Sequence, residues 1–163
     1  MEFRPMRRMR QQLSKEVCDN ILRNATSGTL ALLGDGDYPY AVPLSFVYCG
    51  TCIYFHSAKS GHKIDAIKRE DKASFCVISK DEIHGEEYTT YFSSVIAFGR
   101  ISIVTSPVEK LEGVKLLGRK YNPNDEEGLN REIEKSLAHM ELLRFDIEHL
   151  TGKQAIELVR HYG

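Results

Sequence analysis

Short runs of alternating apolar and polar residues recur along the chain, and this pattern of period two predicts β-strands. In the clearest run, residues 140–150, Leu143, Phe145 and Ile147 fall on one face while charged residues occupy the other. The longest run, residues 91–104, carries Gly99 in its middle, where a barrel needs a bend. The strands that we expect are 28–33, 38–48, 52–55, 72–79, 91–104 and 140–150.

Glycines, prolines and charged residues mark the connections between these strands. The run Gly34-Asp35-Gly36-Asp37 predicts a hairpin, so the first two strands should pair in antiparallel fashion. The second strand contains Pro39 and Pro43, and each lacks the N–H that a sheet ladder needs. We therefore expect this strand to be bulged, bent or at a sheet edge. The charged segment 80–89 predicts an exposed, mobile loop.

Helical spacing of apolar residues predicts the remaining elements. An N-terminal helix is expected at about 13–24, a second helix follows the third strand and ends near Arg69, and a helical insertion covers about 106–138. A turn at Thr151-Gly152-Lys153 then leads into a short amphipathic tail at 155–162. Five or six antiparallel strands with these helices predict a mainly β fold with flanking helices, a small and partly open barrel. We expect a single domain spanning residues 1–163.

Composition narrows the class of protein. The 22 Lys and Arg residues nearly balance the 23 Asp and Glu residues, and the isoelectric point is about 6.6, so we expect no nucleic-acid partner. No apolar run is long enough to span a membrane, and the arginine-rich start lacks the apolar segment of a signal peptide. The four cysteines show no disulfide-framework spacing, which favours reduced thiols in a cytoplasmic protein.

Residues 54–67 are the strongest local candidate for a binding site. An apolar strand is followed by small and hydroxylated residues, then by Gly61, His62 and Lys63, and then by the helix-spaced Ile64 and Ile67. The first turn of a helix offers unpaired N–H groups and the positive end of the helix dipole, so Lys63 beside it predicts a phosphate cradle. The alternative is an ordinary surface turn with solvated lysines.

Other reactive residues form weaker patterns. Cys49-x-x-Cys52 spans a predicted hairpin turn, without the second pair that a four-ligand zinc site requires. His56 and His62 have no acidic residue at a spacing that completes a metal triad, so we expect no metal site. His149 ends the last strand on its inward face and either looks into a pocket mouth or packs in the core.

Several segments, taken in order, carry a family resemblance. They are Gly28-Thr-Leu-Ala-Leu, Tyr38-Pro-Tyr-Ala-Val-Pro-Leu-Ser-Phe-Val-Tyr48, Ile53-Tyr-Phe-His-Ser-Ala58, Gly61-His-Lys-Ile-Asp65, Ser94-Val-Ile-Ala-Phe-Gly-Arg100 and Ile147-x-x-x-Thr-Gly-Lys153. Together they resemble the pyridoxamine 5′-phosphate oxidase-like split barrels, and more narrowly the 5-nitroimidazole resistance (NimA-like) branch. The resemblance implies a six-stranded antiparallel FMN-binding split barrel that forms a homodimer, with FMN bound at the dimer interface.

The resemblance also assigns residues to the cofactor site. It places Val42, Pro43 and Leu44 along the isoalloxazine ring, and Phe55, His56, Ser57 and Ala58 along the ribityl and ring side. It places Gly61, His62 and Lys63 at the phosphate, Ser93, Ser94 and Val95 at the closing wall, and Lys153 near the partner subunit's flavin. Core packing is the alternative for Val42, Leu44, Phe55 and Val95.

His62 departs from the family pattern, which has a second long basic residue at this position, and this leaves FAD as an alternative to FMN. The implied function is an FMN-dependent oxidoreductase that takes electrons from NAD(P)H or another donor and acts on a small molecule, with His56 as the catalytic candidate. In the narrower form it is a nitroreductase for 5-nitroimidazole-type compounds. The alternatives are a non-enzymatic flavin carrier or sensor, and a haem-binding protein with His56, His149 or His161 as axial ligand.

Overall fold

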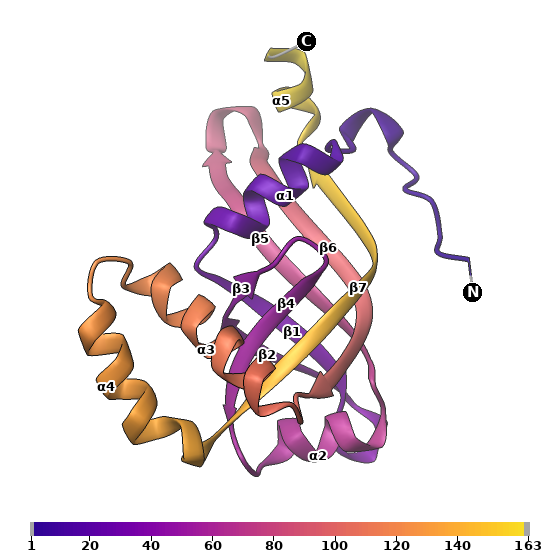
Figure 1. The fold of residues 1–163 in the computed structure, drawn as a ribbon. Coiled ribbons are helices and arrows are strands. Elements are labelled where there is room, and N and C mark those ends of the chain that lie inside the picture. The colour runs from indigo at the N-terminus through magenta and orange to yellow at the C-terminus, as the bar shows by residue number, and fades with distance from the viewer. Residues whose placement is uncertain (1, 162–163) are drawn as a thin grey trace.

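The computed structural model describes residues 2–161, with side chains for residues 2–159. Seven strands form one antiparallel sheet in the order β2-β1-β5-β6-β7-β4-β3 (Figure 1). The strands are β1 Ser27–Leu33, β2 Pro39–Ser45, β3 Val47–Tyr48, β4 Cys52–Ala58, β5 Lys72–His84, β6 Thr89–Ile103 and β7 Met140–Gln154. The α-helices are α1 Lys15–Asn24, α2 His62–Arg69, α3 Pro107–Tyr121, α4 Glu126–Ser136 and α5 Ile156–His161. Short 3-10 turns lie at Met9–Gln11, Asp35–Asp37, Gly85–Glu87 and Leu137–His139.

The prediction of a mainly β, antiparallel fold with flanking helices is confirmed, but the sheet has seven strands where six were predicted. The predicted strand 38–48 is interrupted at Phe46, which separates β2 from β3. These two pieces lie at opposite edges of the sheet, so the chain crosses from one edge to the other within a single residue. The sheet therefore curls until its edges meet at Phe46, and β2, which carries both prolines, is an edge strand as expected.

The main hydrophobic core fills the inside of the curled sheet. Phe46, Phe55, Phe75 and Phe145 are fully buried there, and the Phe55 and Phe75 rings meet edge to face at 5.1 Å. Helix α1 covers one end of the barrel and α2 the other (Figure 1). Both helices bury an apolar stripe against this core, since their buried residues are Cys18 and Leu22 in α1 and Ile64, Ala66 and Ile67 in α2.

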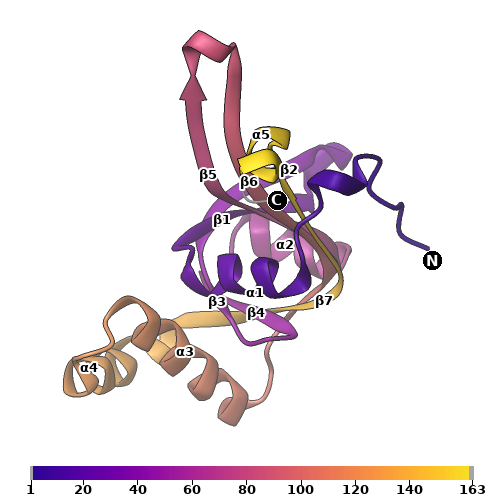
Figure 2. The same cartoon turned by 90° about the horizontal axis from the view of Figure 1, so that it is seen from above.

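The prediction of a loop at 80–89 is wrong. Strand β5 continues to His84 and β6 begins at Thr89, so the two strands form a hairpin arm that projects beyond the barrel (Figure 2). The His84 and Tyr91 rings stack across the arm at 3.7 Å. The arm residues of β5 are mostly exposed and those of β6 from Thr89 to Ser94 are half-buried, so neither face of the arm is fully buried. Its sequence therefore needs no apolar alternation, and the charged residues of 80–89 predict a loop where the strands continue.

The last strand is longer than predicted, because β7 runs on to Gln154 instead of turning after Leu150. Within the predicted turn, Gly152 pairs with Val95, and α1 packs directly over it. A Cβ on Gly152 would approach the Cys18 sulfur and the Leu13 side chain too closely. The glycine therefore marks a close approach within the strand and not a turn.

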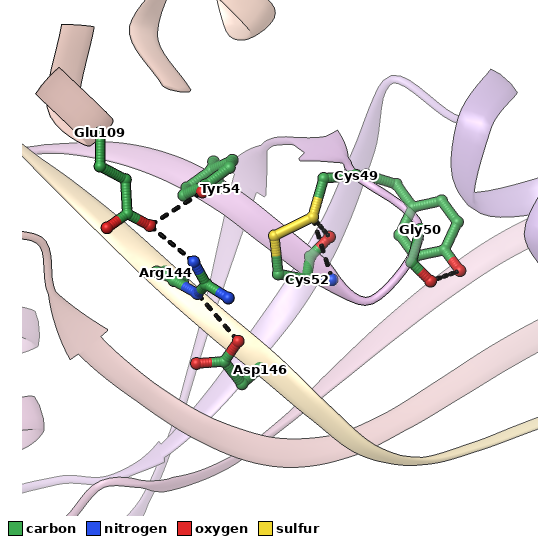
Figure 3. The surroundings of a disulfide bond; sticks show 8 residues. Cys49, Gly50, Cys52, Tyr54, Glu109, Arg144 and Asp146 are labelled. Atoms are coloured by element: carbon green, nitrogen blue, oxygen red, sulfur yellow. Dashed lines mark hydrogen bonds and ion pairs between the residues drawn. A yellow bond between two sulfur atoms is a disulfide. The ribbon is translucent and has the colours of Figure 1, made fainter. Parts of the chain in front are cut away.

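Cys49 and Cys52 form a disulfide across the β3–β4 turn, so the expectation of four reduced thiols is wrong for this pair (Figure 3). Cys18 and Cys76 are free. The turn is also tied to α1, because the Tyr48 hydroxyl bonds to the Asp19 carboxylate at 2.7 Å. Among residues 2–161, no helix is long and apolar enough to cross a membrane.

Candidate functional site

The sheet is split between β2 and β4. Strand β3 pairs with β4 only through Val47 and Tyr48, and upstream of Phe46 the chain leaves β4 to pair with β1. In the residues that the structure describes, the outer edge of β2 has no neighbouring strand. Pro43 offers no N–H along this edge, but the peptide groups of β2 that do not bond to β1 lie where a planar ligand could bond to them.

Residues 42–44, predicted to lie along a flavin ring, form this edge. Val42 and Leu44 are half-buried and pack against the main core, while Pro43 is exposed. The two apolar side chains therefore support the wall from behind, and the Pro43 ring forms its outer surface. The structure thus confirms that the proline-containing strand lies at a sheet edge, and a flavin ring along it stays a prediction.

The corner at Phe46 is held by the last two residues of α3. The Tyr121 hydroxyl accepts a hydrogen bond from the Phe46 N–H at 2.9 Å and lies within bonding distance of the Thr26 carbonyl. Lys120 donates to the Ala25 carbonyl at 2.6 Å and its Nζ lies 3.9 Å from the centre of the Phe46 ring. Burial lowers the pKa of Lys120 to about 8. No local sequence pattern indicates the contact between Tyr121 and Phe46, which are 75 positions apart.

Strand β4 divides its predicted site residues between two faces. Phe55 is fully buried and Ser57 is 7% exposed, so both point into the barrel. His56 and Ala58 are exposed on the outer face. Phe55 therefore takes the core role that the sequence left open, and His56 is presented beside the split. The His56 imidazole has no hydrogen-bond or ion-pair partner within the described part of the chain.

The predicted phosphate cradle lies at the start of α2. Gly61 is the N-cap with φ 122°, and a Cβ placed there would meet nothing within 4 Å, so the approach to the helix N-terminus is open. Lys63 is half-buried without a partner among the described residues, and burial lowers its pKa. Lys63 and the first N–H groups of α2 are thus free to meet an anion.

His62 is directed towards the β1–β2 turn. Its Nε2 accepts a hydrogen bond from the Asp35 N–H at 3.1 Å, and its ring stacks on Tyr40 at 4.1 Å. The Asp35 carboxylate lies 3.7 Å from the same nitrogen. His62 is therefore engaged by the β1–β2 turn, whereas Lys63 beside it has no partner among the described residues.

The other predicted wall lies far from this cradle. Ser93 and Ser94 pair with Gln154 and Lys153 at the last residues of β7, whereas Ser57 and Ala58 pair with its first residues. About 40 Å of strand separates the two groups at the usual rise of a β-strand. The structure thus brings Ser93, Ser94 and Lys153 together, but not with the cradle of the same chain. Val95 is fully buried, so it packs in the core, which is the alternative that the sequence left open for it.

A pocket of about 380 Å³ opens between the split and the helical insertion. Ser45 and His56 contribute from the sheet, and α3 and α4 contribute most of the apolar lining. Sequence reasoning missed this pocket, because it read the insertion only as two helices. The full lining is Ser45, His56, Val114, Leu117, Gly118, Tyr121, Leu129, Glu132, Ile133, Ser136 and Met140.

A polar network fixes α3 against the sheet (Figure 3). Glu109 of α3 accepts hydrogen bonds from Arg144 at 2.7 Å and from the Tyr54 hydroxyl at 2.9 Å, and Arg144 also pairs with Asp146 at 2.8 Å. The Arg144 guanidinium, aided by Tyr54, holds the pKa of the Glu109 carboxyl below its usual range. The position of one pocket wall is therefore coupled to ionised Glu109.

The remaining histidine candidates do not join the split. The His149 ring stacks on Phe3 at 4.6 Å and lies near Phe98, so the N-terminal segment covers it. The side chain of His161 and residue 162 of the predicted tail lie outside the described residues. Within the described part of the chain, no group of three or more His, Cys, Asp or Glu residues is placed to hold a metal ion.

An open antiparallel barrel with its split beside a helix N-terminus defines the class of the split β-barrels. A family model described as pyridoxamine 5′-phosphate oxidase matches residues 14–154, and the chain belongs to this family. No curated protein sequence matches the chain.

Solved structures share the fold at low sequence identity. A protein from Bacteroides thetaiotaomicron, described as a 5-nitroimidazole antibiotic resistance protein, is 18% identical with a TM-score of 0.75, over 88% of this chain and 86% of its own. An FAD- and haem-binding protein from Mycobacterium smegmatis is 21% identical with a TM-score of 0.72, over 94% and 80%. An FAD-binding protein from Mesorhizobium loti is 24% identical with a TM-score of 0.62, over 89% and 97%.

Proposed function

We propose that this protein is a flavin-dependent oxidoreductase whose cofactor lies along the split between β2 and β4. The observation that carries this proposal lies in the described residues: the edge of β2 without a neighbouring strand adjoins His56, which is exposed and has no partner there. The open N-terminus of α2 and Lys63 follow at the end of β4. An elongated ligand with a planar ring at one end and a phosphate at the other fits this order of surfaces.

The residues present fit such a group. Lys63 and the first N–H groups of α2 would hold the phosphate, and Val42, Pro43 and Leu44 would support the ring. When bound, the flavin supplies the hydride or electron transfer, so the protein needs no covalent nucleophile. His56 would orient the substrate or donate a proton to it beside the ring.

FMN is the proposed flavin, and FAD is its rival. Lys63 and the N–H groups of α2 suit a single terminal phosphate, while His62 is held by the β1–β2 turn. The similar structures from Mycobacterium smegmatis and Mesorhizobium loti are described as FAD-binding, which favours testing both flavins.

The site is proposed to be completed by a second copy of the chain. Lys153, Ser93 and Ser94 lie at the far end of β7 from the cradle of their own chain, so only a partner could bring them to it. In such a homodimer the flavin would bind at the interface and contact both subunits.

A nitroaromatic substrate is the narrower proposal, supported by the likeness to the protein described as a nitroimidazole resistance protein. The test is to reduce the bound flavin anaerobically with NADH or NADPH and then add a 5-nitroimidazole. Reoxidation faster than in a substrate-free control is expected. Reoxidation at the control rate would remove the reductase claim and leave a flavin carrier or sensor.

Haem binding is the second candidate, because His56 is exposed and has no partner among residues 2–159, and one similar protein is described as binding both FAD and haem. The absorption spectrum of the purified protein distinguishes the two cofactors. A Soret band that is lost in His56→Ala would establish haem ligation, whereas a two-banded flavin spectrum retained in that variant supports the flavin proposal.

A further inference from the structure

The pocket between β4 and the α3–α4 insertion has an apolar lining. The apolar side chains of this lining are buried or half-buried, so a ligand there would exchange water for hydrocarbon surface. At about 380 Å³ it lies at the lower end of the range for small-molecule sites, enough for one or two rings. The apolar residues are Val114, Leu117, Leu129, Ile133 and Met140.

The polar groups of this pocket are few, and two of them are already bonded. The Tyr121 hydroxyl accepts a hydrogen bond from the Phe46 N–H, and the Ser136 hydroxyl donates to the Glu132 carbonyl at 2.7 Å. The Ser45 hydroxyl, the His56 imidazole and the Glu132 carboxylate are exposed and have no partner in the described part of the chain. Of these, Glu132 carries the charge that a ligand would meet.

Charge in the pocket is one-sided. Its lining, as far as the structure describes it, contains Glu132 but no lysine or arginine. Two nearby cations have other partners, since Lys120 donates to the Ala25 carbonyl and Arg131 lies 3.8 Å from Glu127. Lys135 follows one turn later on α4, and in the described residues it forms no ion pair with Glu132. A carboxylate without an ion-pair partner beside an apolar lining repels anions and attracts cations more strongly than it would in bulk water.

We propose that this pocket binds the substrate, and that Glu132 makes it select small, mainly apolar molecules that are neutral or cationic over anionic ones. This inference rests on the proposed function, because it assigns the substrate class to the site beside the flavin. His56 lines both the pocket and the split, so a polar group on the ligand would meet the imidazole next to the β2 edge.

The test uses three probes of nearly equal size: 4-nitrobenzyl alcohol, 4-nitrobenzylamine and 4-nitrobenzoate. Each is titrated calorimetrically into the oxidised full-length protein at neutral pH, without a reductant, so that binding is measured apart from turnover. The alcohol and the amine are expected to bind, with the benzoate weaker by about tenfold. Equal affinity for all three probes, or tightest binding of the benzoate, would overturn the proposal.

The Glu132→Gln variant should bind the benzoate only about twofold more weakly than the alcohol. It should also bind the amine more weakly than the unmodified protein does, while its affinity for the alcohol is unchanged. Glu134→Gln is the matched control, because Glu134 lies on the same helix but lines a different pocket. If both variants change the probe order equally, the assignment to Glu132 fails. Leu129→Trp narrows the pocket and should weaken the binding of all three probes. Its thermal unfolding should remain cooperative, which shows that the variant still folds.

Flavin binding is measured on the same samples and separates the two proposals. If the protein binds flavin but does not bind the alcohol and the amine more tightly than the benzoate, only the assignment of the pocket is refuted. Absence of flavin binding together with the expected probe order refutes the proposed oxidoreductase and leaves the ligand pocket standing.

Discussion

Lys63 and Lys120 are both half-buried lysines whose pKa burial lowers, but their neighbours give them different roles. Lys120 donates to a carbonyl and lies over the Phe46 ring, so its contacts are satisfied within the fold. Lys63 has no such partner in the described residues and lies in the first turn of α2. Only Lys63 is therefore free to neutralise a phosphate.

Lys63→Ala should weaken FMN binding by about tenfold or more, because it removes a charge-assisted hydrogen bond. The dissociation constant is measured by quenching of FMN fluorescence on binding. Lys68→Ala is the matched control, since Lys68 is exposed on the last turn of the same helix. An unchanged constant for Lys63→Ala would discredit the phosphate assignment.

Glu109 should make the stability of the protein depend on pH. Arg144 and Tyr54 hold its folded pKa below the unfolded value, so its stabilisation is full above the unfolded pKa and is lost as the pH falls through the folded one. Glu109→Gln should lower the free energy of unfolding by about 1 kcal/mol at pH 7, and by less in acid. Urea unfolding at neutral and acidic pH measures this, with Glu112→Gln on the same helix as control.

If the difference in free energy of unfolding between the unmodified protein and Glu109→Gln is the same at neutral and acidic pH, the proposed coupling of α3 to ionised Glu109 is contradicted.

At the level of single elements, β6 bends where its register with β7 shifts, between Phe98 and Gly99. The sequence predicts this bend from a glycine in mid-strand. The structure adds the cause, since a Cβ on Gly99 would overlap the backbone carbonyl of Asp146. Backbone cannot move aside as the end of a flexible side chain can, so this glycine is required by the packing of β6 on β7.

Gly99→Ala should therefore lower the free energy of unfolding by about 2 kcal/mol or more. Gly85→Ala in the arm is the control, because a Cβ there meets nothing within 4 Å. Urea unfolding followed by circular dichroism gives both values. If the two variants unfold at the same urea concentration, the close approach at Gly99 is not a constraint.

Local pattern predicts the elements well where one face is buried and the other exposed, as in β7 from Met140 to Leu150. It fails where that contrast is missing. Neither face of the arm around His84 is fully buried, and the β7 extension looks like a turn because α1 requires Gly152. Pro39 and Pro43 are the only local sequence features that indicate the break at Phe46.

The candidate site likewise has parts that local sequence predicts and parts that depend on tertiary contacts. Residues 42–44 and Gly61 to Lys63 could be placed from turn chemistry and helix-start chemistry, and the resemblance added their roles. The pocket beside His56 could not, since it forms only when α3 and α4 fold over β4. The role of Tyr121 at the Phe46 corner likewise depends on a contact that no local pattern encodes.

For the whole molecule, the two halves of the predicted flavin site lie at opposite ends of β7. A homodimer with two interfacial sites would resolve this separation. Lys153→Ala should then weaken FMN binding although Lys153 is far from the cradle of its own chain.

Mixed dimers test this arrangement. In a hybrid of a Lys63→Ala chain and a Lys153→Ala chain, one interfacial site has lost both lysines and the other has kept both. Re-association of equal amounts of the two variants should restore tight FMN binding at about a quarter of all sites, because about half of the dimers are hybrids and each hybrid has one intact site. If the mixture binds no better than either variant alone, the two lysines do not share a site across an interface.

The central claim is that the split between β2 and β4 binds a flavin. It is tested most directly by titrating FMN and FAD into the purified, cofactor-stripped protein and following the flavin absorption and fluorescence. The account predicts saturable binding at one flavin per chain, with FMN tighter than FAD and with Pro43→Ala and Lys63→Ala both weakening it. Absence of saturable binding for both flavins would contradict the account.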